Sequence, residues 1–288
     1  MMGHAIGDHA YGESGIEFLL VDRSHSRHRV RRVRVDVRLG MDHPEVYRDG
    51  DNSRLVPASS LVNSVLCLGA GHTGAEPETF ALALAEHFLA REHQPRVADV
   101  HVTCSELEGV AAGPGQRPGT RHFGPAARPR TYAHVTLPDD SEPTVRGGLQ
   151  DVELFVTGGA TFTGFARDAY TTTQVFTDRV FGARLDVTWQ HTAPGARGVD
   201  HRACRLRARQ AVTDAFVGHT SHSSQHTFYQ LGAAVLDACP EIAHVRVEGA
   251  HLTRALVDLT PLGTENDGCI YTTADHQQST VAVEVHRT

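Results

Sequence analysis

The order of predicted strands and helices along this 288-residue chain occurs twice, and this repetition limits the possible folds more than any other feature. In the first half, alternation of apolar and polar residues predicts strands, and apolar residues at helical spacing predict helices. The order is strand, strand, helix, helix, strand, strand: Gly15–Asp22, Val30–Leu39, Ser60–Gly69, Glu78–Arg91, Ala98–Cys104 and Thr131–Leu137.

The second half follows the same order of elements. They are predicted at Val152–Thr157, Ala183–Gln190, His201–Val217, Ser224–Cys239, His244–Val247, Arg254–Leu259 and Thr280–His286. Adjacent strands beside pairs of helices favour an α+β fold, in which antiparallel sheets carry their helices on one face. We therefore expect two tandem units, residues 1–148 and 149–288.

Local signals predict how some of these elements begin and where one loop lies. Ser59 or Ser60 is a candidate N-cap for the first helix, because a side-chain hydroxyl can accept a hydrogen bond from a free helical N–H. Pro77 opens the second helix, since proline is tolerated at a first helical position. The Gly-, Pro- and Arg-rich segment 109–130 predicts a loop.

Charge and composition exclude several classes of protein. A net charge of −7 argues against an extended nucleic-acid surface, and the short basic run 27–34 alternates Arg with Val as a strand with one wet face does. No apolar run reaches the roughly 18 residues of a membrane span. The cysteines are odd in number and form no CxxC pair, which indicates free thiols and a cytoplasmic protein: Cys67, Cys104, Cys204, Cys239 and Cys269.

The 20 histidines raise the question of a metal site. His219, His222 and His226 are spaced by three and four residues, which could put two of them on one helical face. Two of the three precede the predicted helix or stand at its start, and no nearby carboxylate completes a ligand set. We therefore expect surface histidines and no metal.

Two segments carry a resemblance to a known family. They are TFTGFARDAYTTTQVFTDR, residues 161–179, and SSQHTFYQ, residues 223–230, with a third short match at Asp51-Asn52-Ser53. These segments resemble urate oxidase (uricase). The resemblance implies two tunnelling-fold (T-fold) units per subunit, a homotetramer with active sites at subunit interfaces, and oxidation of a small purine by O2 with neither metal nor organic cofactor.

The resemblance also implies which residues hold the purine. The family uses a phenylalanine to stack on the ring, an arginine to clamp one edge and a glutamine to pair with the other; the matching positions are Phe162, Arg179 and Gln225. By the same match, the backbone at Ser224 borders the ring. These side chains suit a planar, acidic, nitrogen-rich ligand, because a guanidinium binds such an edge bidentately.

The chain departs from the family where protons are handled. It contains no lysine, and all 27 basic residues are arginine. The family's first strand begins Tyr-Gly-Lys, and its lysine supports a threonine just after the Asn-Ser motif. Here Glu13 follows Tyr11-Gly12, Ala58 stands at the threonine position, and Ser59 replaces the aspartate that follows it.

The family also uses a histidine in its proton relay, and the position of that histidine can be matched to this sequence in two ways. Counting back from Val257-Asp258-Leu259 puts it at Thr253, with His251 in the place of an asparagine at the oxygen site. Matching the turn Glu248–His251 makes His251 the histidine itself. Either solution puts His251 near the site, and we expect it to act as the general base.

A glutamate in place of a lysine repels an anionic substrate but can accept a proton from a neutral one. We therefore expect a cofactor-independent oxidase of an 8-oxopurine that releases H2O2, with a substrate shifted from urate to a relative such as 8-oxoguanine. Glu13 and His251 would handle protons. Two alternatives stay open: a urate oxidase with a rebuilt proton relay, and a catalytically inactive purine-binding protein. A pterin-type T-fold reaction ranks last, because it would require metal-binding histidines.

Overall fold

The protein was analysed as a computed structural model that describes residues 4–90, 95–111, 115–252, 254–272 and 279–287. The chain divides into two compact units. Unit 1 comprises residues 1–148 and 190–203, and unit 2 comprises residues 149–189 and 204–288. Residues 190–203, which the sequence prediction assigned to the second unit, therefore cluster with the first.

Unit 1 is built on an antiparallel sheet with the strand order β1-β2-β3-β5. Its strands are β1 (His9–Asp22), β2 (Arg29–Met41), β3 (Val97–Gly109) and β5 (Arg130–Pro138), and the first residues of β6 continue it. Apolar residues alternate with polar ones along β2 and β3. As a result, the opposed pairs Val35–Val102 and Val100–Val135 fall on one face of the sheet and are buried.

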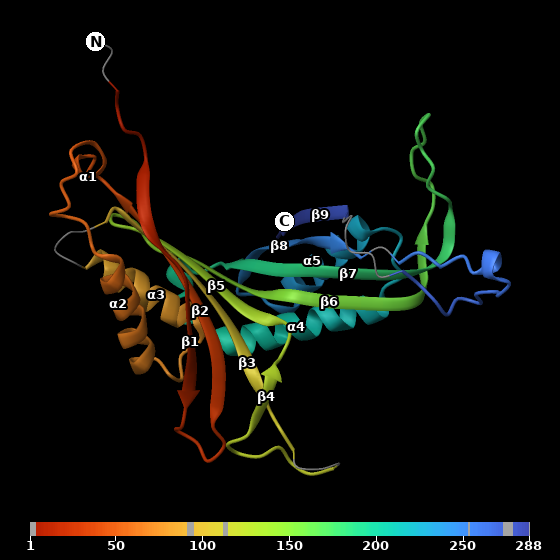
Figure 1. The fold of residues 1–288 in the computed structure, drawn as a ribbon, viewed down its shortest axis with the longest axis horizontal. Helices are drawn as coiled ribbons and strands as arrows, with labels where there is room; N and C mark the ends of the chain where they lie inside the picture. The colour runs from red at the N-terminus through yellow and green to blue at the C-terminus, as the bar shows by residue number, and fades with distance from the viewer. Residues whose placement is uncertain (1–3, 91–94, 112–114, 253, 273–278, 288) are drawn as a thin grey trace. The chain divides into compact units, whose positions relative to one another are not determined.

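Two helices, α2 (Ala58–Gly71) and α3 (Pro77–Leu89), cover that buried face. Figure 1 shows both on the same side of β1, β2 and β3. Phe80, Leu84 and Phe88 of α3 are almost fully buried and join the valines of the sheet in one core. The opposite face of the sheet carries polar side chains, because period-two alternation sends every second residue there.

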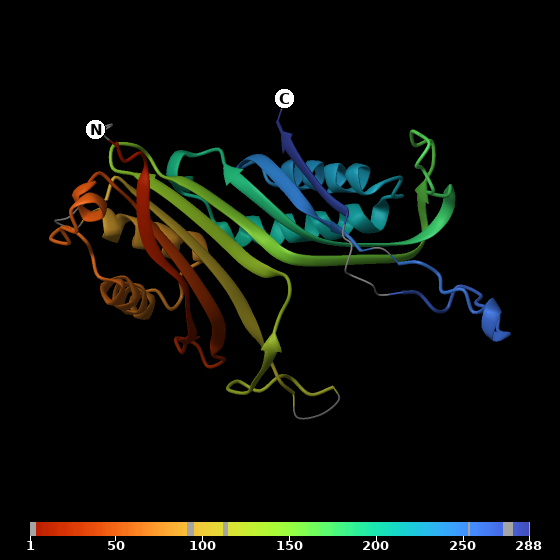
Figure 2. The same cartoon turned by 45° about the horizontal axis from the view of Figure 1, so that its top comes forward.

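Unit 2 repeats this plan. The rest of β6 (Thr144–Phe162) is followed in the sheet by β7 (Phe176–His191), β8 (Ile242–His251) and β9 (Ser279–His286). Strands β8 and β9 pair antiparallel, with Val245 opposite Val285. Figure 2 shows these four strands as long, adjacent ribbons.

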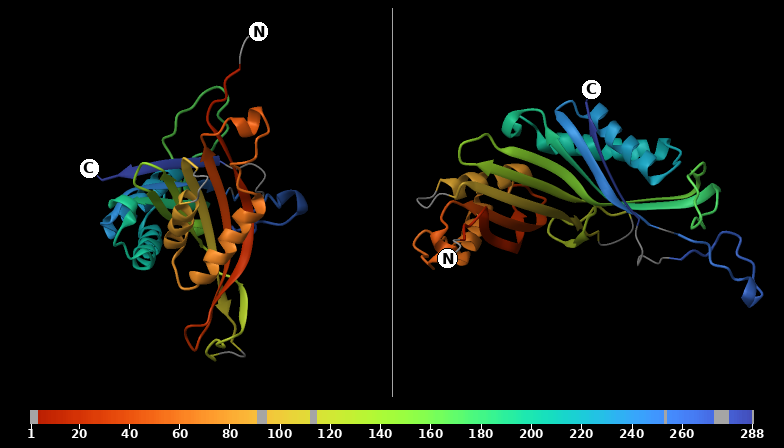
Figure 3. Two further views of the ribbon diagram at one scale, coloured as in Figure 1. Left: turned by 90° about the vertical axis from the view of Figure 1, so that its left-hand side faces the viewer. Right: turned by 90° about the horizontal axis from the view of Figure 1, so that it is seen from above.

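Helices α4 (His201–Gly218) and α5 (Ser224–Ala238) lie together on one face of this second group of strands, as the right panel of Figure 3 shows. Helix α5 packs on β8 and β9, where Gly232 lets the helix approach: a Cβ at that position would lie 2.9 Å from a methyl group of Val285. Phe228, Leu231 and Val235 of α5 are fully buried.

The predicted fold class is confirmed: antiparallel strands carry two helices on one face in each unit, and the order of the main strands and helices is as predicted except at residues 254–259. Pro77 does open α3. No helix in the described part of the chain is long and apolar enough to cross a membrane. All five cysteines are free thiols.

Three local predictions were wrong, and some short helical elements were not predicted. Residues 254–259 form no strand, only an isolated bridge from Leu256 to Tyr271. The predicted loop 109–130 contains the short strand β4 (Phe123–Ala126), which pairs with β3. Helix α2 begins at Ala58, so Ser59 and Ser60 lie inside it and Pro57 is the N-cap, without a side-chain hydrogen bond. A short helix α1 (Glu45–Arg48) was not predicted, and two 3-10 turns, Pro194–Ala196 and Thr260–Leu262, complete the described elements.

Candidate active site

Three of the expected site residues lie on neighbouring strands of unit 2. Phe162 is the last residue of β6, Arg179 lies near the start of β7, and His251 is the last residue of β8. Since β6 and β8 flank β7, these ends can meet at one end of the sheet. Side chains alternate between the two faces along a strand. Arg179 is two residues before the buried Phe181, and His251 is four residues after the buried Val247, so both lie on the helix-covered face.

Arg179 lies among aromatic rings and forms no ion pair within the described part of the chain. Its Cζ lies 5.2 Å from the ring centroid of Phe162 and 5.9 Å from those of Phe176 and Phe181, which are cation–π distances. Its buried Nε has no hydrogen-bond partner among the described residues. Burial lowers the pKa of the guanidinium. A half-buried cation on aromatic faces with an unused donor suits a flat ligand that carries acceptors on its edge.

His251 lies next to this arginine. Its ring stacks on Phe181 with a centroid separation of 5.3 Å. Burial lowers the pKa of His251 below its ordinary value, and the positive charges of Arg179 and Arg254 lower it further. The imidazole is therefore held neutral near pH 7, the form that accepts a proton. Thr253, the alternative for the family's histidine position, lies outside the described residues.

Ser224 and Gln225 are the first two residues of α5. The side chain of Ser223, the N-cap, accepts a hydrogen bond from the backbone N–H of His226, at 3.1 Å. The N–H groups of the first helical residues have no partner within a helix, and with the helix dipole they favour a negative group. Ser224 is buried, whereas the Gln225 side chain is exposed.

A pair of hydrogen bonds ties the start of α5 to the end of β6. The backbone N–H of Thr161 donates to the carbonyl of Ser221 at 2.7 Å, and the Thr161 hydroxyl is 2.9 Å from Nδ1 of His222. Phe162 follows Thr161 directly. The structure therefore connects the segment carrying Ser224 and Gln225 to the strand end that carries Phe162, all within unit 2.

The expected proton-handling residue Glu13 lies in unit 1, on β1. Glu13 lies opposite Val37 on β2, and Tyr11 lies opposite Leu39. Because Val37 and Leu39 are buried, Glu13 and Tyr11 point to the helix-covered face of their sheet. The register shifts just after Glu13. Among the described residues, the half-buried Glu13 side chain forms no hydrogen bond or ion pair, which leaves its carboxylate available.

Ala58 and Ser59 occupy in unit 1 the place that Ser224 and Gln225 occupy in unit 2. They are the first two residues of α2, and both are exposed. The hydroxyl of Tyr11 accepts a hydrogen bond from the backbone N–H of Val56, at 3.0 Å, which ties the approach to this helix to β1. Ala58 offers only its backbone, and Ser59 offers a hydroxyl one residue further along.

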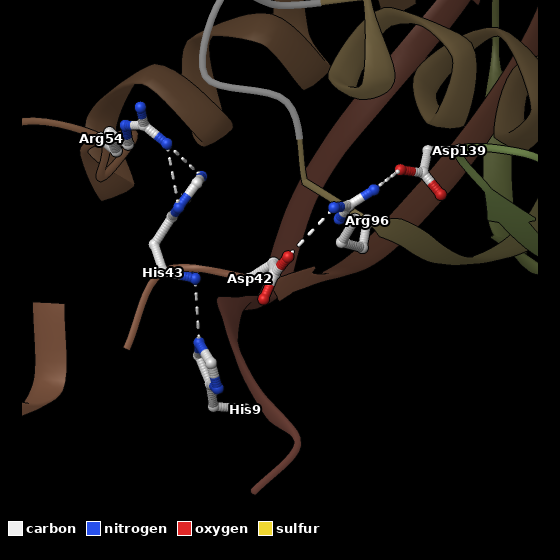
Figure 4. A network of polar contacts seen from close by, with 6 residues as sticks. All are labelled: His9, Asp42, His43, Arg54, Arg96 and Asp139. Atoms are coloured by element: carbon white, nitrogen blue, oxygen red, sulfur yellow. Dashed lines mark hydrogen bonds and ion pairs between the residues drawn. The ribbon is translucent and has the colours of Figure 1, made fainter. Parts of the chain in front are cut away.

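A polar network that the sequence analysis missed lies before α2. Figure 4 shows Arg96 between Asp42 and Asp139, with nitrogen-to-oxygen distances of 3.0 and 2.8 Å, and Arg54 against His43 at 3.2 Å. Asp42, His43, Arg54 and Arg96 line an open pocket of about 500 Å³ that also includes Asp51 and Ser53. The register of β2, β3 and β5 brings Asp42, Arg96 and Asp139 together, so no local sequence pattern could have identified them.

The three histidines considered for a metal do gather in space. The ring centroid of His226 is 4.6 Å from that of His219 and 5.3 Å from that of His222. His219 also contacts the Thr227 hydroxyl at 3.2 Å. In the described residues, the clusters with three ligand atoms within reach of one ion lie elsewhere: Asp99, His101 and His134, and His244, Glu284 and His286.

Comparison with known proteins identifies the family. Residues 145–285 match the family model described as Uricase. The uricase of Arthrobacter globiformis is 25% identical over 282 residues, covering 98% of this chain and 90% of the relative. The uricase of Oryctolagus cuniculus is 25% identical over 264 residues, covering 89% and 86%.

Solved structures agree on the fold. The crystal structure of the Arthrobacter globiformis uricase superposes with a TM-score of 0.89 at 23% identity, covering 99% of this chain and 96% of that one. A Bacillus fastidious uricase gives 0.80 at 19% identity, covering 96% and 93%. These likenesses show the fold, and the matched family model and the relatives above place the chain in the urate oxidase (uricase) family of oxidoreductases, which use O2 as co-substrate and need no cofactor.

Proposed function

We propose that this protein is a cofactor-independent oxidase of an 8-oxopurine, with its preference shifted from urate toward a related purine such as 8-oxoguanine. The observation that carries the proposal is the environment of Arg179. A guanidinium on the face of Phe162, with an unpaired Nε and no carboxylate partner among the described residues, matches a planar ligand with acceptors along one edge.

The ring would stack on Phe162 while Arg179 and the Gln225 amide bind its two edges. The free N–H groups at the start of α5, at Ser224 and Gln225, would stabilise negative charge as it develops on the ring. The interactions with the Arg179 guanidinium and with the helix N–H groups strengthen when the substrate loses a proton. Substrate binding and activation would therefore be coupled at this site.

Proton transfer would be the task of Glu13 and His251. The neutral His251 imidazole can take a proton from the substrate. Glu13 can act as a second base or hold the protonated imidazole. A carboxylate here disfavours a substrate that is already anionic, and this charge is the reason for proposing a neutral purine.

The reaction would then proceed on the deprotonated ring. The purine anion transfers one electron to O2, and the two radicals combine to form a hydroperoxide at C5. Water adds to the ring as hydrogen peroxide leaves. Overall, the purine, one O2 and one water give the hydroxylated purine and H2O2, so the electrons balance without a further oxidant.

We also propose that the active protein is a homotetramer in the cytoplasm. Glu13, Ala58 and Ser59 belong to unit 1, and the ring-binding residues belong to unit 2. In this proposal unit 1 of a neighbouring subunit completes the pocket with the backbone around Ala58 and Ser59. The five free cysteines are consistent with a reducing compartment.

The test is oxygen consumption with H2O2 detection, using metal-stripped protein offered urate and 8-oxoguanine in parallel. Turnover of 8-oxoguanine but not urate supports the shifted preference. Turnover of urate alone would instead favour a urate oxidase whose relay is rebuilt from Glu13 and His251. An amino group facing Arg179 is a poor partner for a guanidinium, so 8-oxoguanine must bind with that group at the other edge.

A second candidate rests on the loss of both the lysine and the threonine. A protein that keeps Phe162, Arg179 and Gln225 but has lost the relay could bind a purine without oxidising it. Equilibrium binding of both purines, with no oxygen consumption by a tetramer of verified fold, would favour this non-catalytic function over the first proposal.

A further inference from the structure

A cluster of two histidines and one aspartate lies on the sheet of unit 1, outside the residues proposed for catalysis. Asp99 and His101 are two residues apart on β3, so they share a face. His134 lies on β5, directly opposite His101. Their neighbours Ala98, Val100 and Val102 are fully buried under the helices. The cluster therefore lies on the opposite face from α2, α3 and Glu13.

The donor atoms converge on the aspartate. Nε2 of His101 is 3.1 Å from one carboxylate oxygen of Asp99, and Nε2 of His134 is 2.9 Å from the other. The two imidazole rings stack with centroids 3.9 Å apart. All three ligand atoms lie within 4.8 Å of one another. Two nitrogens bonded to one metal ion at about 2.1 Å each lie at most about 4.2 Å apart. Small rotations of the imidazole rings would therefore bring the ligand atoms within bonding distance of one ion.

The cluster is supported by a second layer of polar groups. The Tyr132 hydroxyl is 3.3 Å from Nδ1 of His101, the ring nitrogen that faces away from Asp99. The Thr136 hydroxyl donates to Asp99 at 2.9 Å. Metal-binding histidines usually have their second ring nitrogen held in this way, because the contact fixes the tautomer and the ring orientation.

The side chains of the cluster are partly buried but remain accessible to an ion. The side chains of His134, Asp99 and His101 are 15%, 28% and 38% exposed. Asp99 also lines an open pocket of about 750 Å³ in unit 1, which gives an ion a path to the carboxylate. An aspartate carboxyl is ordinarily ionised near neutral pH, as a ligand must be.

We propose that Asp99, His101 and His134 form a binding site for a divalent transition-metal ion such as Zn²⁺. Two imidazoles and one carboxylate are a common ligand set for such ions and leave coordination positions for water. The similar group His244, Glu284 and His286 in unit 2 is the weaker candidate. Its His286 side chain is 62% exposed, and the nitrogen-to-oxygen distance from His244 to Glu284 is 3.7 Å.

The test is a competition titration of Zn²⁺ between a chromophoric chelator and the metal-stripped, full-length protein. We expect one site per chain that outcompetes the remaining histidines. Asp99→Asn and His134→Ala should each weaken that site by at least about 100-fold, and Tyr132→Phe, which removes no ligand, by about 10-fold. His286→Ala is the matched control and should leave the affinity unchanged.

Co²⁺ provides a second readout, because its visible absorption reports the ligands directly. Bands that appear with the wild type and disappear with Asp99→Asn support the site. A wild type without saturable binding, or an Asp99→Asn protein that binds as the wild type does, overturns the proposal. So does a loss of binding with His286→Ala alone. Circular dichroism of each variant separates loss of a ligand from loss of the fold, and none of these outcomes depends on purine oxidation.

Discussion

The two units share one plan but differ in the chemistry at corresponding places. In each, a helix begins beside the sheet and leaves its first N–H groups free: α2 at Ala58 in unit 1 and α5 at Ser224 in unit 2. Beside α5 the strands carry a cation and an imidazole, Arg179 and His251. On the helix-covered face of unit 1, β1 instead presents Glu13.

In the proposed function, this difference separates purine binding from the choice of substrate charge. Phe162 and Arg179 of unit 2 would bind the planar ring, with His251 as a base beside them. Glu13 of unit 1, a carboxylate where the family has an ammonium, would determine which charge the substrate carries when it binds. Variants in the two units should therefore have different kinetic effects.

The largest effect is expected from Glu13→Ala. If Glu13 takes up a substrate proton, its removal should lower kcat by about 10²- to 10⁴-fold while the purine still binds. The measurement is oxygen consumption alongside equilibrium binding of the same purine. Glu17→Ala is the control, because Glu17 is an exposed residue of the same strand whose ion pair with Arg34 is on the surface. Full activity in the Glu13 variant would exclude the proposed role.

A related change tests the sign of the charge. Glu13→Lys restores the cation of the family at this position and should shift preference toward urate, since a positive group stabilises the urate anion. The ratio of kcat/KM for urate to that for 8-oxoguanine should rise. An unchanged ratio would mean that Glu13 does not set the preference.

Arg179→Gln should act on binding. Removing the charged hydrogen-bond partner of a bound purine costs about 2–5 kcal/mol, a loss of roughly 30-fold or more in purine affinity. Calorimetric titration with 8-oxoguanine in the absence of O2 measures it directly. Arg184→Gln on the same strand is the control, because Arg184 points to the other face and pairs with Glu153. Equal affinities in the wild type and the Arg179 variant would show that the purine binds elsewhere.

Each unit also has a glycine within two residues of its proposed proton-handling residue, at a position that admits no side chain. A Cβ on Gly12 would collide with the backbone carbonyl of Val37, and one on Gly249 with that of Arg184. Gly12→Ala and Gly249→Ala should each destabilise the protein by about 1–3 kcal/mol through forced separation of strands. Thermal unfolding measures the loss, with Gly71→Ala, at an open position, as the control. An unshifted unfolding temperature would show that these strands can separate freely.

The sequence predicted the order of elements because alternation and helical spacing are local properties. The predicted strands were too short. For example, β6 was predicted at Val152–Thr157 but extends to Phe162. The prediction stopped early because Gly158 and Gly159 resemble a turn when they are considered alone. Contacts between distant residues were not predictable in this way. His101 and His134 meet only through the register of β3 with β5, and Phe162 and Arg179 were paired only through the family resemblance.

The smallest effect concerns the titration of His251. Its pKa in the folded protein is lowered from the ordinary 6.5, so the unfolded chain takes up the proton first as the pH falls. Stability associated with this histidine is therefore complete above about pH 6.5 and declines as the pH falls through and below that value. Proton NMR of the imidazole against pH should show a midpoint below 6.5. Arg254→Gln should raise that midpoint only part of the way, because burial and Arg179 remain. A midpoint at or above 6.5 in the wild type would contradict the lowered pKa, and one well above 7 would mean that His251 is mostly protonated at neutral pH, which would favour Glu13 of unit 1 as the proton acceptor.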